Sequence, residues 1–524
     1  MNNTKVLFCC FFCFSLLIVS QAQEFNHQFI DEQIEELHHL ENYAHTSVKP
    51  ILFEAHPYSD ISLLFSDKKY AKYLNQNLID VQTNDFKLII NPLFNLSIGK
   101  EAEEGTFVNT RAFEVKGVIG ESTSFYSSFY ENQAIFPKFL ENHIWENEMS
   151  VPGQGQSRWY DRNTTRVFDF AMANGHVSHQ LSKHFNFQFG HGKHFLGDGY
   201  RSMFLSDYSF NYPYFKITTD VWKVKYVNLF SSYQDLRDEF SLVGVNRKKF
   251  STIHYLSYNV SSRLNISLFE AIVWEQDTLG RGFDVNYLNP IIFYRPIEFS
   301  LGSSGGNAMM GVSSKLKLSN SAHLYSQFII DEFKLSELSD ANGWWANKYG
   351  GQIGMKYYNV FKVDNLLIQG ELNFSRPFMY SHARPLQSYT HYHQPLAHPI
   401  GASFIEGISI LRYRVKRIYS EFKYLYAKHG GEMAGDDTNY GSNVLISYDD
   451  GERHEYGNYI AQGNTTDLQM LDFKVGMLLN PHTNMKLELG VLNRKTSSLY
   501  EIDTNTTHIY VAFKTDLRNL YYDF

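Results

Sequence analysis

Cysteine is almost absent from this sequence of 524 residues, which has only Cys9, Cys10 and Cys13, all in the first apolar segment. If that segment is removed during export, the remaining chain has no disulfide, no thiolate metal site and no cysteine nucleophile. Long apolar runs are also missing beyond it, since none approaches the roughly 20 residues that a membrane-spanning helix needs. A disulfide-stabilised fold and a bundle of transmembrane helices are therefore both excluded.

The first apolar segment, residues 1–22, has the features of a secretory signal peptide. Lys5 precedes an apolar run that ends at Val19, and the small residues Ser20 and Ala22 are spaced as in a cleavage site. A lipoprotein signal would place a small residue directly before a cysteine, whereas the three cysteines follow phenylalanine or another cysteine. We expect cleavage after Ala22 and export into a bacterial envelope.

Aromatic residues are abundant instead, at 16% of the chain, with 42 Phe and 36 Tyr. Strands favour such side chains, and many segments alternate between apolar and polar residues with a period of two, as a wall between lipid and water requires. The clearest of these segments are 185–189, 222–226, 368–374, 411–416, 485–489 and 509–514. A large secreted β protein would also alternate, but it would seldom use so many strands with such long loops. The pattern favours an all-β fold, a transmembrane antiparallel β-barrel of the outer membrane.

The length bounds the size of this barrel. If it occupies residues 85–524 and each strand with its connection takes about 24 residues, it has about 18 strands, with 16 to 20 acceptable. The closing residues LYYDF resemble the terminal recognition signal of outer-membrane barrels, so we expect the last strand to end on Phe524, with Tyr522 and Leu520 on the same face.

Residues 23–84 differ from the rest because apolar residues fall at helical spacing in 26–45 and again in 67–80. We expect a small periplasmic helical segment that caps or plugs the barrel, the alternative being a leader that docks weakly.

A second unusual segment, residues 428–463, is acidic and rich in Gly and Asn. Their spacing matches no calcium loop, and the long outer loops of barrels suggest a solvated loop outside the cell.

The polar run 189–219 allows two interpretations. A hydrolase would need Ser202 or Ser206 as nucleophile, and the accompanying bases and carboxylates would be His191, His194, Asp198 and Asp207. However, the run has no G-x-S-x-G elbow, and the members of a triad usually meet through the fold. The structural interpretation is that glycines turn the chain while Arg201 pairs with Asp198 or Asp207 in the lumen, since a guanidinium group can tie several carboxylates together. We favour this structural lumen motif of Asp198, Arg201 and Asp207.

The same run, GHGKHFLGDGYRSMFLSD followed by NYPYFKITTDVWKVKY, resembles outer-membrane proteins of the RemB gliding-motility type, which are related to the Wzi capsule-assembly barrels. Further similar segments are 110–137, 286–298, 390–406 and 480–495, so the resemblance extends over most of the chain. It implies an outer-membrane barrel that organises surface polysaccharide, has no enzyme activity and is partly closed by periplasmic helices. A role in gliding motility, with envelope or motility proteins as partners, is also implied.

An acidic polysaccharide would need basic side chains inside the barrel. Two strand-like segments provide them opposite their apolar residues, namely Lys223 and Lys225 on one and Arg412, Arg414 and Lys416 on the other. These five residues are the candidate polysaccharide-binding set. The alternative is that carboxylates such as Glu371 or Glu421 neutralise them.

Metal and phosphate sites are less well supported. His391, His393 and His398 could hold zinc or copper, but Glu406 is the only nearby carboxylate and the prolines around them indicate a loop. The glycine-rich 302–311 lacks the Lys-Ser/Thr ending of a phosphate loop. We expect no metal, no cofactor and no nucleic acid.

The predicted function is a non-enzymatic outer-membrane protein that attaches or organises surface polysaccharide, with a channel or a barrel-embedded hydrolase as alternatives.

Overall fold

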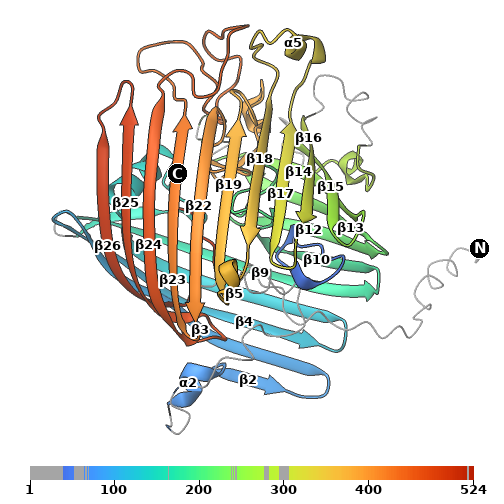
Figure 1. Cartoon of the computed structure of the whole chain (residues 1–524), viewed down its shortest axis with the longest axis vertical. Helices are drawn as coiled ribbons and strands as arrows, with labels where there is room; N and C mark the ends of the chain where they lie inside the picture. Colours follow the sequence, from blue (N-terminus) through green and yellow to red (C-terminus); the bar gives the residue numbers. More distant parts are fainter. Residues whose placement is uncertain are drawn as a thin grey trace, which may run out of the picture.

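The computed structural model describes residues 39–51, 64, 68, 70–162, 165–237, 239, 241, 245–276, 283–293, 306–515 and 518–524. Over these residues, 18 antiparallel strands form a closed ring (Figure 1), so the predicted fold class and strand number are confirmed. The ring closes where the last strand pairs with the first one, from Lys514 opposite Asn95 to His508 opposite Glu101. In the described part of the ring every strand thus has a paired neighbour on both sides, as a barrel in lipid requires.

The strands of the ring follow one another in chain order. They are β3 (Phe86–Glu101), β4 (Glu104–Ile119), β5 (Thr123–Ile135), β9 (Thr165–Ser182), β10 (Phe185–Gly192), β12 (Tyr212–Val221), β13 (Val224–Gln234), β14 (Lys248–Asn259), β15 (Leu264–Glu275), β16 (Asn307–Lys317), β17 (Ala322–Ile330), β18 (Tyr349–Tyr357), β19 (Leu366–Ser375), β22 (Phe404–Val415), β23 (Ile418–His429), β24 (Thr466–Asn480), β25 (Met485–Ser498) and β26 (Thr504–Thr515).

Short elements decorate the ring. The strands are β1 (Val48–Lys49), β2 (Ile79–Gln82), β6 (Ser150–Val151), β7 (Gly155–Gln156), β8 (Arg158–Arg162), β11 (Phe195–Leu196), β20 (Thr390–His391) and β21 (Gln394–Pro395). The helices are α2 (Ala71–Asn75), α3 (Lys138–Glu146) and α5 (Leu335–Ser339), with 3-10 turns η2 (Val285–Leu288), η4 (Val360–Lys362) and η5 (Pro385–Gln387). Among the residues described here, no helix is long and apolar enough to cross a membrane.

The period-two pattern sorts side chains between the two faces of the wall. On β10, Phe185 and Phe189 point outward, with Phe189 68% exposed, whereas Asn186 and Gln188 are buried inside. β19 repeats the pattern with Leu372 exposed at 59% between inward-facing polar residues. An outer surface of exposed Leu, Ile, Val and Phe on successive strands is the lipid-facing surface of a transmembrane barrel.

The two ends of the barrel differ in their connections. One end carries short turns, such as 222–223 between β12 and β13 and 416–417 between β22 and β23, the latter at the bottom of Figure 1. Most connections at the opposite end are long, including 193–211, 376–403 and 430–465. Barrels of this kind have short periplasmic turns and long outer loops. The long connections therefore mark the outer end.

Two of the long connections fold back into the barrel. Residues 193–211 and 376–403 meet there, since the Ser206 amide donates to the Leu396 carbonyl at 2.8 Å and the Tyr380 hydroxyl to the Met203 carbonyl at 2.8 Å. Their apolar side chains form a buried core with the inner faces of β12–β17, in which the rings of Phe204 and Phe269 stack at 4.6 Å. The barrel interior beside β12–β17 is therefore filled like the core of a soluble domain.

The end of the chain departs from the prediction of a final strand ending on Phe524. The last strand, β26, ends at Thr515, and residues 518–524 lie inside the barrel, where Tyr521 and Asp523 are buried. The prediction was wrong because Tyr521, Asp523 and Asn519 have polar partners in the interior. A lipid-facing strand would leave these groups without partners.

The N-terminal predictions fall partly outside the described residues. Those residues include none of the predicted signal peptide and only 39–45 of the first predicted helix. The second predicted helix, 67–80, is reduced to α2, and β2 follows it. Residues 43–51 contact the barrel interior: His45 Nδ1 lies 2.8 Å from the Ser257 hydroxyl, and β1 pairs with β11. A plugging role for 23–84 stays a prediction.

Candidate functional site

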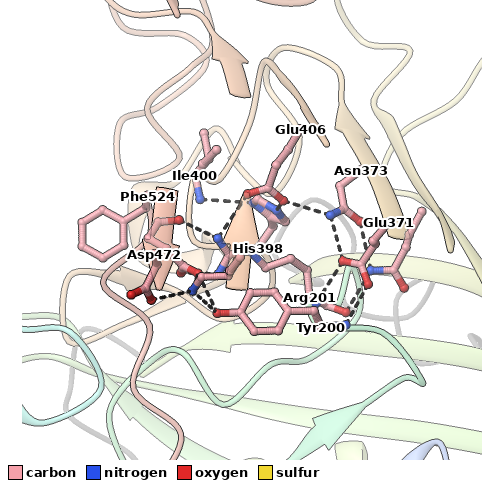
Figure 2. A network of polar contacts seen from close by, with 12 residues as sticks. Tyr200, Arg201, Glu371, Asn373, His398, Ile400, Glu406, Asp472 and Phe524 are labelled. Carbon is pink, nitrogen blue, oxygen red and sulfur yellow. Dashed lines mark hydrogen bonds and ion pairs between the residues drawn. The ribbon is translucent and has the colours of Figure 1, made fainter. Parts of the chain in front are cut away.

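The segment 193–211 leaves β10 and carries Arg201 into the centre of the barrel, where its side chain is fully buried. Gly199 permits this path, because a Cβ at that position would lie 2.6 Å from a Glu371 carboxylate oxygen. Glu371 in turn accepts the amides of Tyr200 at 2.7 Å and Arg201 at 3.0 Å (Figure 2). One inward carboxylate of β19 therefore fixes the backbone of this segment.

Arg201 does not pair with the carboxylates that the sequence suggested. Its guanidinium donates to Asp523 Oδ1 at 2.9 Å, to the Asp523 carbonyl at 2.6 Å and to Glu406 Oε1 at 3.1 Å. The prediction of Asp198 or Asp207 as partner was wrong because residues 518–524 enter the barrel and supply a nearer carboxylate.

Asp198 and Asp207 bind other groups. Asp198 accepts from the Thr46 hydroxyl and lies 3.7 Å from Lys315 Nζ. Asp207 accepts from the Tyr521 hydroxyl and from the Asn519 amide, both at 2.9 Å. The two carboxylates therefore contact the N-terminal and C-terminal segments rather than Arg201.

The remaining carboxylates are also satisfied. Glu406 on β22 receives hydrogen bonds from His398 Nε2 at 2.7 Å and from Asn373 at 2.9 Å. Lys423 on β23 donates to Asp523 Oδ2 at 2.5 Å, and the Tyr200 hydroxyl donates to the same oxygen at 2.6 Å. Figure 2 shows these groups converging from several strands and two connections. Because buried charges are costly unless paired, this network pins the connections to the wall.

The hydrolase hypothesis finds no assembled triad among its own residues. The Ser202 hydroxyl donates to the Leu196 carbonyl at 2.6 Å, and the Ser206 hydroxyl donates to the Ala397 carbonyl. His191 Nδ1 lies 3.1 Å from the Ala173 carbonyl, and His194 Nδ1 lies 3.3 Å from the Tyr212 hydroxyl. Both serines therefore point at main-chain acceptors rather than at a general base.

The three histidines of the metal hypothesis have separate surroundings. His391 binds the Gln234 amide through Nδ1 at 3.0 Å and lies 3.1 Å from the Asn211 carbonyl, while His398 binds Glu406. Burial lowers the pKa of His391 to about 3 and that of His393 to about 4. Within the described part of the chain, no three His, Cys, Asp or Glu side chains come together as a metal centre would require.

The predicted basic ladders are only partly inside the barrel. Lys223 lies in the turn between β12 and β13, with Nζ 5.1 Å from the Tyr43 ring, and Lys225 pairs with Asp220 at 3.3 Å. Arg412 and Arg414 share the inward register of Ile408 and Ile410 on β22.

Lys416 is exposed in the turn that follows β22, so its placement in the lumen was wrong. A turn begins there because Lys416 has a φ of 54° and ends the alternation. Arg412 is neutralised, as the alternative anticipated, since its Nε donates to Glu421 at 2.5 Å.

A cavity of about 420 Å³ lies beside the buried network, between the inner wall of β22–β26 and β3–β5 on one side and residues 193–207 and 518–523 on the other. Four carboxylates line it, along with eight basic side chains, which are Lys49, Lys193, Lys356, Arg412, Lys423, Lys474, Lys514 and Arg518. Its aromatic lining includes Phe94, Phe136, Phe139, Tyr130, Tyr200, Tyr510, Tyr521 and Tyr522. The volume falls within the range of about 300 to 1,000 Å³ that is usual for ligand sites.

Polar groups in this cavity retain free bonding capacity. His194 Nε2 and Asn95 Oδ1 are buried and have no hydrogen-bond partner. Burial lowers the pKa of Lys193 to about 7, with Asp207 opposing the shift and Arg518 adding to it. The cavity therefore offers both charge and open hydrogen-bond positions to a polar ligand.

Sequence reasoning missed the residues that matter most here, which are Tyr200, Lys423, Asp472 and Asp523. Lys423 and Asp472 carried a usable signal, because both sit at inward positions of their strands and pair across the wall. Asp523 carried none, because the alternation of LYYDF is equally compatible with a final strand.

Fold and interior together define a closed, 18-stranded outer-membrane type β-barrel with a filled centre and a lateral cavity. No protein-family model and no curated protein matches the sequence. Among solved structures, the chain is similar to Wzi of Escherichia coli, described as a carbohydrate-binding β-barrel involved in group 1 capsule assembly, with 11% identity and a TM-score of 0.48 over 80% of this chain and 84% of that one.

Porin-like barrels are similar to about the same degree. OprD of Pseudomonas aeruginosa has 10% identity and a TM-score of 0.43 over 84% of this chain and 97% of its own. OccAB4 of Acinetobacter baumannii has 9% identity and a TM-score of 0.42 over 83% of this chain and 98% of its own. With identities of 9 to 11% and TM-scores below 0.5, none of these similarities supports an inference about this chain.

Proposed function

We propose that this protein is a non-enzymatic outer-membrane barrel that binds and organises an acidic surface polysaccharide. The observation that carries the proposal is the lateral cavity, where eight basic side chains outnumber four acidic ones among aromatic rings. Lysine and arginine bind carboxylates through charge-assisted hydrogen bonds, and aromatic faces pack against the apolar faces of sugar rings. The lining therefore offers basic groups for the carboxylate of an acidic sugar and aromatic rings for its apolar face.

The filled centre of the barrel argues for a binding protein rather than a channel. A diffusion or export channel needs a continuous aqueous path, whereas the connections 193–211 and 376–403 pack into an apolar core against β12–β17. The resemblance of the sequence to RemB-type and Wzi-like proteins favours the same function. A link to gliding motility, with envelope or motility proteins as partners, rests on that resemblance and is part of this proposal.

The decisive measurement in cells is the amount of surface polysaccharide retained with and without the protein. In vitro, the purified barrel should bind tetragalacturonate more tightly than the neutral maltotetraose. Because several weak charge contacts are screened by salt, the preference should shrink as ionic strength rises from low to about 0.5 M. Equal binding of the two oligosaccharides at low salt would contradict the proposal.

A matched pair of variants locates the binding. Arg412→Gln removes a basic group from the cavity, while Glu421 keeps Lys474 as a partner at 3.3 Å. Lys416→Gln removes the same charge four residues away, in the exposed turn. We expect only Arg412→Gln to weaken tetragalacturonate binding, by about fivefold, or about 1 kcal/mol. If both variants bind like the wild type, the cavity is not the site.

A further inference from the structure

Asp523 is held as a bound carboxylate ligand would be held. Its two oxygens receive the guanidinium of Arg201, the ammonium of Lys423 and the hydroxyl of Tyr200 at 2.5 to 2.9 Å. The three donors come from a connection inside the barrel and from β23, and all are at least largely buried. Burial alone would raise the pKa of the Asp523 carboxyl, but Arg201 and Lys423 keep it well below its usual range.

The carboxylate belongs to a segment that is separate from the wall. Residues 518–524 form no strand, and their side chains make up one side of the lateral cavity. Polar side-chain contacts of the segment include Tyr521 and Asn519 to Asp207 and Tyr522 to Gln154, which are individually modest hydrogen bonds. A ligand that supplied a competing carboxylate could exchange with it without breaking any strand pairing.

One of the three donors, Arg201, also keeps capacity for a second acceptor. Arg201 Nε is buried without a partner, and Tyr200 and Lys423 face the cavity. The unpartnered His194 Nε2 and Asn95 Oδ1 lie in the same lining and suit the hydroxyls of a sugar ring. The cavity thus extends from the donors that bind Asp523 to further polar atoms that have no hydrogen-bond partner.

From these contacts we propose that Tyr200, Arg201 and Lys423 form the binding site for the carboxylate of a hexuronate residue, and that Asp523 occupies this site when no glycan is bound. The inference rests on the proposed polysaccharide function and adds its regulation: residues 518–524 are an internal competitor that the glycan must displace. The apparent association constant for the glycan then equals the intrinsic association constant multiplied by the fraction of barrels in which Asp523 has left the site.

The first test removes the competing charge and keeps the side-chain shape. Asp523→Asn should bind tetragalacturonate about tenfold more tightly than the wild type, because the neutral amide no longer competes for Arg201 and Lys423. Maltotetraose binding should not change. The control is Asp503→Asn, which removes an exposed carboxylate in the β25–β26 connection and should leave both affinities as they are. Each variant is first checked for folding by its heat-dependent shift on a detergent gel.

The second test follows the segment itself. The sequence has no cysteine after Cys13, so Leu520→Cys gives one thiol inside the cavity, and the parent chain gives the background. Maleimide labelling at this thiol should become at least about fivefold faster with saturating tetragalacturonate, because the segment leaves its buried position, and should not respond to maltotetraose. An unchanged labelling rate at saturation would overturn the exchange.

The outcomes separate this inference from the function on which it rests. If the wild type binds tetragalacturonate but Asp523→Asn binds it equally or more weakly, the competitor is refuted and the polysaccharide function stands. If neither protein prefers the acidic oligosaccharide, the proposed function fails and the inference falls with it.

Discussion

At the scale of single residues, loss of the Arg201 side chain should strongly destabilise the barrel. Arg201→Ala leaves Asp523 and Glu406 without their shared partner in the barrel interior. Removing one member of a buried charge pair costs about 3 to 5 kcal/mol. We expect a clearly lower temperature for conversion of the folded gel band to the unfolded one.

Ser202→Ala is the matched control for this change, one position along the chain. It removes the hydrogen bond to the Leu196 carbonyl and the one accepted from the Phe204 amide, and should cost about 2 kcal/mol, less than the loss of the charge pair. If Ser202→Ala instead left the barrel as stable as the wild type and abolished polysaccharide retention, the structural role of this motif would give way to a catalytic one.

Residue-level prediction succeeded where one strand decides the environment of a side chain and failed where distant segments meet. The inward positions of Glu371 and Arg412 follow from alternation along β19 and β22. The partners of Arg201 do not, because Asp523 lies 322 positions away and reaches it through a segment that has no periodic pattern. A contact between residues so far apart in the sequence produces no local pattern from which it could be predicted.

At the scale of elements, the connection 193–211 behaves as part of the core. Phe204 is completely buried and stacks on Phe269 of β15. Phe204→Ala should therefore open a cavity and cost about 3 to 5 kcal/mol. Phe189→Ala provides the contrast, since that ring lies on the outer face of β10 and is already 68% exposed. Thermal conversion on a gel should shift for Phe204→Ala much more than for Phe189→Ala; equal shifts would mean that the connection is not packed as a plug.

Strands were predictable elements, whereas the segments inside the barrel were not. A strand between lipid and interior must alternate, so the sequence shows it directly. The connections 193–211 and 376–403 pack mostly against other parts of the protein, and such segments have no period to detect. The fold of the wall, including its strand number, could be predicted for this reason, while the filling of the centre required the structure.

At the scale of the whole molecule, the closed ring and its apolar outer surface predict behaviour in membranes and detergent. The exported protein should begin at Gln23, fractionate with the outer membrane and migrate faster unheated than boiled, because a closed barrel resists detergent until it is heated. Fractionation, N-terminal sequencing and a paired gel test these points. Release from membranes by high salt or carbonate without detergent would contradict a transmembrane barrel.

The filled interior predicts the conductance of the whole barrel. Water and ions need a continuous path, but on one side the buried core occupies the interior, and on the other residues 518–523 border the lateral cavity. Purified protein in planar bilayers should therefore show no steady conductance like that of an open porin of 16 to 18 strands. Asp523→Asn should also stay closed, because it frees a binding site and leaves the core between 193–211 and 376–403 in place. Large, long-lived openings of the wild type would mean that this core moves aside in the membrane, and the channel function would then replace the binding function.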